Sequence, residues 1–204
     1  MKKIQNGLFK AFSVTAYFAQ LNLQWLLFTL LGLIFLGIGP ASVTLIQFLH
    51  RYREDGTQYS FQQFWKSYRN QFKTTMVWGV LLVLLVATLG INLRIIAVFF
   101  KDQPWLSPIY SVASLVVLYL FLLSFLTFSK AQDTSFKDCL KASVFLAFRF
   151  PLQGLALIFT CYLLLLLLGA KTSLLLIFGA SLLFFSADYF HSRMIQKMQR
   201  IATK

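Results

Sequence analysis

The fold is decided by the stretch from Pro151 to Ala187, which reads PLQGLALIFTCYLLLLLLGAKTSLLLIFGASLLFFSA. Its only charged residue is Lys171, which divides it into two apolar halves. A helix needs about 20 predominantly apolar residues to cross roughly 30 Å of hydrocarbon. Each half approaches this length, so the stretch predicts two membrane-spanning helices joined by a tight turn.

The composition of the whole chain points to the same environment. Of the 204 residues, 58% are hydrophobic and only 12% are charged, whereas a soluble domain carries about 25% charged residues. Lipid must therefore be the solvent for much of the apolar surface. We predict an all-α membrane protein that forms a single integral membrane domain over residues 1–204. Its expected elements are about five transmembrane helices, 18–38, 75–94, 105–128, 151–169 and 172–190, and two cytoplasmic amphipathic helices, 60–73 and 134–148.

The basic residues indicate the orientation, because Lys and Arg collect on the cytoplasmic side of a membrane. If five spans alternate, most of the 19 Lys and Arg residues fall on one side. This predicts a cytoplasmic carboxyl end and an external amino end. One alternative stays open, because Lys2, Lys3 and Lys10 would then be translocated against the usual bias. A re-entrant half-helix over 41–50 would leave four complete spans and put the amino end in the cytoplasm.

The first large loop contains an amphipathic pattern. Aromatic residues recur at steps of three and four, which places them on one face of a helix, with basic and polar residues on the other. Such a helix is typical of a segment that lies flat at a membrane surface, and it could also dock a partner subunit. The candidates for this surface are Phe61, Phe64, Trp65, Lys66, Tyr68 and Arg69.

The second loop repeats this pattern more weakly. Ser135 and Phe136 open an amphipathic segment that leads into a span, as Ser60 and Phe61 do in the first loop. Two interpretations stay open: a parallel internal repeat, which is a known way to build membrane folds, or the coincidence of a common pattern.

A resemblance to a known family rests on four short motifs. They are LNLQWLLF from Leu21 to Phe28, GIGPA from Gly37 to Ala41, RYR from Arg51 to Arg53, and FWKSYR from Phe64 to Arg69. In these motifs the chain resembles the YesL family of small bacterial integral membrane proteins, which is grouped under a domain of unknown function. The resemblance implies a bacterial plasma membrane location and no established activity. It also implies a link to carbohydrate uptake, since family members are often encoded beside carbohydrate uptake and degradation genes. It defines no catalytic or binding residues.

The motif residues have structural and functional interpretations. Gly37, Gly39 and Pro40 should break a helix, since glycine weakens it and proline removes a donor. The break would be a hinge with exposed amides, or the plain end of a span followed by a short helix. Asn22 is expected to form a hydrogen bond between helices, and Trp25 to anchor the chain at the interface.

Few residues could carry chemistry. Asp188 and His191, one helical turn apart, could form a proton relay, although an ion pair near a helix end is simpler. Cys139 and Cys161 have no spacing that suggests a disulfide or a metal site. Because no catalytic motif appears, we expect no enzymatic activity, no cofactor and no metal. The aromatic and basic residues of the first loop lie on different faces, which disfavours nucleic-acid binding.

These observations lead to one functional hypothesis and one alternative. Spans with few polar groups make a poor translocation path. We therefore expect a non-enzymatic accessory or scaffold protein linked to carbohydrate uptake, in contact with the lipid bilayer and with carbohydrate transporter subunits. The alternative is a small stand-alone transporter or channel that acts as a homo-oligomer.

Overall fold

The protein is helical throughout its described part. The computed structural model describes residues 2–100, 102–131 and 134–202, and their side chains except for residues 2–8, 10, 136 and 202. No strand occurs among these residues. The predicted all-α class is therefore confirmed. The helices are α1 (Lys2–Leu31), α2 (Ile38–Asp55), α3 (Phe61–Phe99), α4 (Leu106–Lys130), α5 (Phe136–Arg149), α6 (Pro151–Gly169) and α7 (Thr172–Ala202).

Five of these helices are long and apolar enough to cross a membrane. The segments are Ala11–Leu31, Phe61–Phe99, Leu106–Lys130, Pro151–Gly169 and Thr172–Ile201. Their number agrees with the predicted five spans. The remaining long helix, α2, lies among them and is the most buried part of the chain: every residue from Gly39 to Ile46 is buried.

The helix break falls before the Gly-Ile-Gly-Pro motif rather than within it. Helix α1 ends at Leu31, not at residue 38 as predicted, and residues 32–37 form a turn in which Leu33 and Ile34 have positive φ angles of 56° and 62°. Pro40 then lies in the first turn of α2, where its missing N–H leaves no hydrogen bond unmade. The motif therefore starts a helix that reverses the chain direction.

Helix α2 runs back along α1, so the chain reverses its direction after α1. Trp25 Nε1 donates to Ser42 Oγ at 2.8 Å, and further along the pair the rings of Tyr17 and Tyr52 lie 5.0 Å apart. The connection after α2 returns to the beginning of α1, where the backbone N–H of Tyr59 donates to Tyr17 Oη at 3.2 Å. The amino end and the basic segment that follows α2 therefore lie on the same side. The reversal resembles the re-entrant alternative, but α2 has 18 residues and is about 27 Å long instead of ten residues and about 15 Å, and five candidate spans remain instead of four.

The aromatic segment of the first loop is the beginning of α3. Phe28 of α1 stacks on Phe61 and Phe64 at 5.4 and 5.2 Å, and Phe48 of α2 meets Phe64 edge-on. A capping box at Ser60 and Gln63 starts the helix. Phe64 and Tyr68 of the aromatic face thus pack against α1 and α2 and cannot lie on a membrane surface, whereas Phe61 and Trp65 stay exposed.

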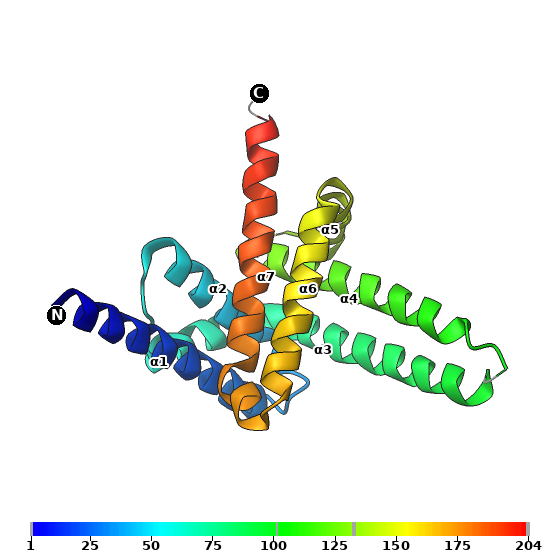
Figure 1. Ribbon diagram of the computed structural model, residues 1–204, viewed down its shortest axis with the longest axis horizontal. Coiled ribbons are helices and arrows are strands. Elements are labelled where there is room, and N and C mark those ends of the chain that lie inside the picture. Colours follow the sequence, from blue (N-terminus) through cyan, green and yellow to red (C-terminus); the bar gives the residue numbers. More distant parts are fainter. Residues whose placement is uncertain (1, 101, 132–133, 203–204) are drawn as a thin grey trace.

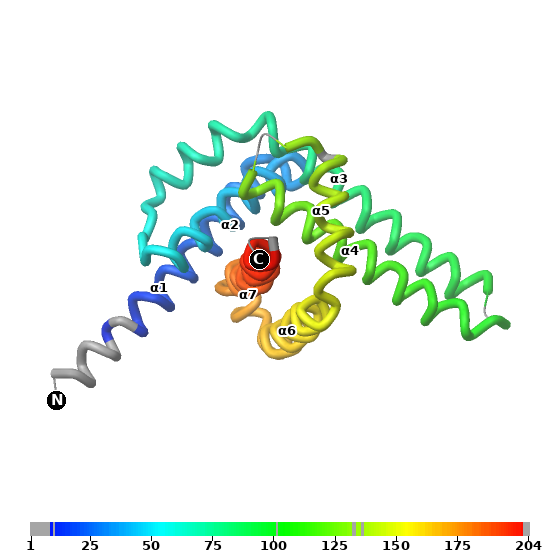
Figure 2. The backbone as a smooth tube through the Cα atoms, turned by 90° about the horizontal axis from the view of Figure 1, so that it is seen from above, coloured from blue at the N-terminus to red at the C-terminus, as the bar shows by residue number. Residues whose placement is uncertain are grey.

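Two hairpins leave the buried core in different directions. Figures 1 and 2 show α3 and α4 projecting together to one side, while α6 and α7 form a second hairpin with another orientation. At the root of the first hairpin, Gly79 of α3 meets Gly39 of α2 backbone to backbone, so that no side chain separates the two helices. The parallel repeat stays a prediction: α3 continues unbroken from its amphipathic start into a span, whereas α5 ends at Arg149 before α6 begins.

Candidate functional site

A buried cluster of charged side chains joins three helices that are distant in sequence. Asp188 of α7 is fully buried. Its carboxylate lies 2.8 Å from Arg53 Nη1 of α2, 2.8 Å from Lys130 Nζ of α4, and 3.1 Å from His50 Nδ1 of α2. An isolated charge inside a protein is very costly, and this carboxylate is neutralised on two sides. The cluster therefore fixes α2 and α4 to the inner part of α7.

His191, one turn after Asp188, belongs to the same cluster without contacting the carboxylate directly. The Lys130 ammonium lies 3.1 Å from His191 Nδ1, and Thr127 Oγ1 lies 3.1 Å from Nε2. Because an ammonium group can only donate, Nδ1 must accept, and the ring proton is on Nε2. Lys130 thus lies between Asp188 and His191, and it fixes the neutral imidazole tautomer.

His50 extends the cluster to Glu54. Its Nε2 lies 3.1 Å from Glu54 Oε1, and its Nδ1 lies near both Arg53 Nη2 at 2.9 Å and Asp188 Oδ2 at 3.1 Å. Arg53 Nη2 also donates to Ser192 Oγ at 2.7 Å, which ties α2 to α7 a second time.

Two members of this cluster, Asp188 and His191, are predictable from the sequence, and the others are not. Asp188 and His191 were singled out because ionisable groups near a span are rare. Arg53 and Lys130 were counted only as loop cations that report orientation. Nothing in their spacing links them to Asp188, because Arg53 and Asp188 are 135 positions apart and meet only after α2 folds back. Among the described residues, no group of three His, Cys, Asp or Glu side chains is placed to hold a metal ion.

The family-motif residues hold the helix packing together. Asn22 Nδ2 donates to the backbone oxygen of Leu176 at 2.7 Å, and the backbone N–H of Ser181 donates to Asn22 Oδ1 at 3.0 Å. Both ends of the amide therefore bind the backbone of α7. Trp25 binds Ser42 of α2, and a side chain at Gly37 would collide with the backbone oxygens of Thr29 and Phe28. The polar groups of Asn22 and Trp25 and the space beside Gly37 are therefore used in contacts between helices. For Asn22 this is the expected hydrogen bond to another helix.

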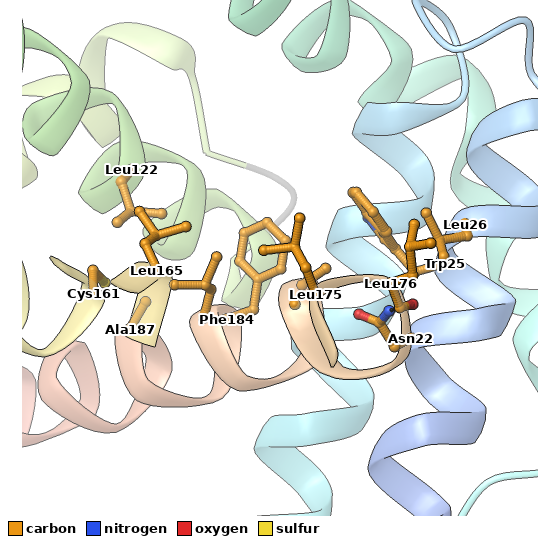
Figure 3. Close-up of a pocket in the computed structure, with 13 residues that line it drawn as sticks. Asn22, Trp25, Leu26, Leu122, Cys161, Leu165, Leu175, Leu176, Phe184 and Ala187 are labelled. Atoms are coloured by element: carbon orange, nitrogen blue, oxygen red, sulfur yellow. Dashed lines mark hydrogen bonds between the residues drawn. The ribbon is translucent and has the colours of Figure 1, made fainter. Parts of the chain in front are cut away.

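An apolar cavity of about 510 Å³ lies along α7. Figure 3 shows its lining in a row, from Leu122, Cys161 and Ala187 at one end to Trp25 and Asn22 at the other. The polar atoms of Asn22 already bind α7. The cavity therefore offers almost no hydrogen-bonding group to a hydrophilic substrate.

The predicted docking residues divide into two sets. Phe64 and Tyr68 are buried at 0% and 4% exposure, so they hold α3 to α1 and α2 and cannot contact a partner. This corrects their assignment to a docking surface. Phe61, Trp65, Lys66 and Arg69 remain exposed on the outer face of α3.

Replacing Asn22 with Leu tests the bridge to α7. The variant loses both hydrogen bonds and leaves the Leu176 oxygen and the Ser181 N–H without their partner, so we expect a loss of about 1–2 kcal/mol. The measurement is thermal unfolding in a fixed detergent. Asn92→Leu is the control, because Asn92 lies near the free end of α3. Equal unfolding midpoints for Asn22→Leu and Asn92→Leu would show that the two hydrogen bonds of Asn22 contribute nothing to stability.

Three comparisons place the chain among known proteins. Residues 18–93, from α1 into α3, match a family described as "Protein of unknown function, DUF624". The uncharacterized protein YesL of Bacillus subtilis (strain 168) is 28% identical over 181 residues, which cover 88% of this chain and 85% of YesL. The uncharacterized protein YteU of the same organism is 34% identical over 80 residues, which cover 39% of this chain and 36% of YteU. No solved structure matches. The resemblance predicted from the sequence motifs is thereby confirmed: the chain is similar to YesL over most of its length, and its first part matches the DUF624 family.

Proposed function

We propose that this protein is a non-enzymatic accessory or scaffold component of the bacterial plasma membrane that binds membrane subunits of a carbohydrate uptake system. The observation that carries the proposal is the α3–α4 hairpin. The most apolar window of α3 has no buried residue, so all its faces are open apart from its contact with α4. Exposed apolar side chains of this hairpin include Leu84, Ile91, Ile109 and Val112. A hairpin that projects from its own core in this way suits packing against the helices of another membrane protein.

The interior supports an accessory role over independent sugar transport. A sugar carries many hydroxyl groups, and a path through a membrane protein must replace the hydrogen bonds that these groups make with water. The cavity along α7 is lined mainly by apolar side chains, and Asn22 is already bonded to α7. The link to carbohydrate uptake itself rests on the family resemblance.

The proposal includes an orientation in which both chain ends face the cytoplasm. With α2 folded back, Lys2, Lys3 and Lys10 join the side that holds the other basic segments. Of the 19 Lys and Arg residues, Arg94, Lys101 and Lys171 then belong to the opposite side, together with Arg69 and Lys73, which lie beside the far end of α1. This distribution follows the positive-inside rule more closely than the five-span alternation does.

Thiol labelling tests this orientation. In a background with Cys139 and Cys161 replaced by Ser, we expect Lys3→Cys and Gln58→Cys to react with a membrane-impermeant reagent only after the cells are opened. Ser107→Cys, at the start of α4, should react in intact cells. Labelling of Lys3→Cys in intact cells, with Gln58→Cys still protected, would contradict this orientation and show that the amino end is external.

Purification in a mild detergent tests the accessory role. The wild-type chain should be recovered with a membrane subunit of a carbohydrate transporter, and the double variant Leu84→Trp/Val112→Trp should lose it. Leu167→Trp is the matched control, because Leu167 is exposed to a similar degree on α6. Recovery of the wild-type chain without any transporter subunit would contradict the proposal.

The stand-alone transporter remains the second candidate because of the cavity along α7. Vesicles containing only this protein would distinguish the two. Uptake of a labelled sugar above that of empty vesicles would favour the transporter, and its absence agrees with the accessory role.

A further inference from the structure

A second hollow lies between the end of α1 and the outer face of α3. Its volume is about 520 Å³. Leu31 and Gly32 form one wall, and the aromatic side chains of Trp65, Tyr68 and Phe72 form the other. Arg69 and Lys73 complete the lining. The hollow therefore combines an apolar surface with two cations, unlike the cavity along α7.

The two cations have no counter-charge among the described residues. Arg69 and Lys73 are four residues apart, so they lie on one face of α3, and both are exposed. No carboxylate of the described residues pairs with either of them. The sequence contains no Asp or Glu from Gly56 to Lys101. A ligand with a negative group would thus supply the missing charge.

The position of the hollow relative to the membrane follows from the same side chains. Unpaired cations are costly in hydrocarbon, so Arg69 and Lys73 must lie in the interface, where lipid phosphates are found. Leu31 and Trp65 beside them are 62% and 44% exposed. Covering these apolar side chains with acyl chains is favourable because it removes their surface from water. The hollow thus presents cations to the headgroup layer and an apolar wall to the lipid chains.

We propose that this hollow binds one anionic phospholipid. The phosphate contacts Arg69 and Lys73, and the beginning of an acyl chain packs against Leu31, Trp65 and Phe72. A free phosphate ion would satisfy the two cations but would leave this apolar wall uncovered, and a neutral lipid would leave the cations without a counter-charge. The two cations and the apolar wall together therefore fit an anionic lipid best.

The hollow is held open by rigid contacts. Tyr68 Oη donates to the backbone oxygen of Phe28 at 3.1 Å, which fixes this turn of α3 to the end of α1. A side chain at Gly32 would collide with the backbone of Gly37 and with Tyr68 Oη, so only glycine keeps the turn and the hollow in this form. The site is thus preformed, and binding requires little ordering of the protein.

Native mass spectrometry of the full chain, delipidated in detergent, tests the proposal with phosphatidylglycerol and phosphatidylcholine as probes. Two interfacial cations predict a preference of roughly 30-fold for phosphatidylglycerol. The variant Arg69→Gln/Lys73→Gln should lose this preference. Arg193→Gln/Lys197→Gln is the matched control, since it removes the same two charges at the same spacing on α7 and should keep the preference.

Each opposite outcome would overturn the inference. Equal binding of the two lipids, an unchanged preference in Arg69→Gln/Lys73→Gln, or an equal loss in the control would show that no specific site exists here. Displacement of bound lipid by millimolar glycerol phosphate would show an anion site without a chain contact. Both variants change exposed side chains, so unfolding midpoints equal to that of the wild type would confirm that the fold is intact. The result is independent of the proposed accessory role, because no partner protein is present.

Discussion

Replacing Asp188 with Asn is expected to destabilise the protein by about 2–4 kcal/mol, because it leaves Arg53 and Lys130 as half-buried cations without their shared carboxylate. The loss should appear as a lower unfolding midpoint in detergent and a lower yield of folded protein. Helices α2, α4 and α7 should separate first, since the cluster is the point at which all three meet.

Two further variants distinguish the cluster from a general surface effect. Asp138→Asn removes an exposed carboxylate that lies 4.0 Å from Lys141, and it should change stability by less than about 0.5 kcal/mol. Adding Lys130→Met to Asp188→Asn should recover part of the loss, because it removes one of the two stranded cations. If the double variant were less stable than Asp188→Asn by the full effect of Lys130→Met, the two side chains would not be coupled.

Replacing Gly39 with Leu is expected to cost more than about 3 kcal/mol, because the added side chain has no space to occupy. A Cβ atom at Gly39 would collide with the backbone oxygen of Thr75 and with the backbone of Gly79, and backbone atoms cannot rotate away. Gly79→Leu should have a similar effect from the other side of the contact. The measurement is the unfolding midpoint together with the fraction of protein that elutes as a monodisperse peak.

Gly90 provides the control for these glycine variants. It lies on the same helix as Gly79, but nothing surrounds a Cβ atom placed there within 4 Å. Gly90→Leu should therefore be neutral or slightly stabilising, since leucine favours a helix over glycine by several tenths of a kcal/mol. Equal effects of the changes at Gly39 and Gly90 would show that α2 and α3 are not in backbone contact.

The lipid-facing parts of the fold could be predicted because hydropathy reports contact with lipid. The α6–α7 hairpin is the clearest case: its long apolar runs and the single Lys171 place both helices and the turn. The start of α3 was also predictable, since Ser60 and Gln63 form a recognisable capping box.

Helix α2 could not be predicted from hydropathy, because it does not face lipid. It is surrounded by protein rather than lipid, so it tolerates Ser42, Thr44 and Gln47, which lower its hydropathy. Gln71 Nε2 donates to the buried Thr44 Oγ1. A search for apolar runs passes over such a helix. The reversal of the chain after α1 is therefore missing from the predicted topology.

The candidate site could be predicted only in part because its members meet through tertiary structure. Asp188 and His191 were visible as rare ionisable groups near a span, but their spacing suggested a direct pair. In the structure Lys130 lies between them, and it comes from a different helix. Likewise, the aromatic face of Phe64 and Tyr68 looked like a free surface, because the sequence does not show that Phe28 covers it.

The most direct test of the account is photo-crosslinking in living cells from the exposed face of the α3–α4 hairpin. A photoreactive amino acid is placed at Leu84 or Val112, with Leu167 on α6 as the reference position. The account predicts a crosslink from the hairpin positions to a membrane subunit of a carbohydrate transporter, and only lipid adducts from Leu167. Lipid adducts alone from all three positions would contradict it.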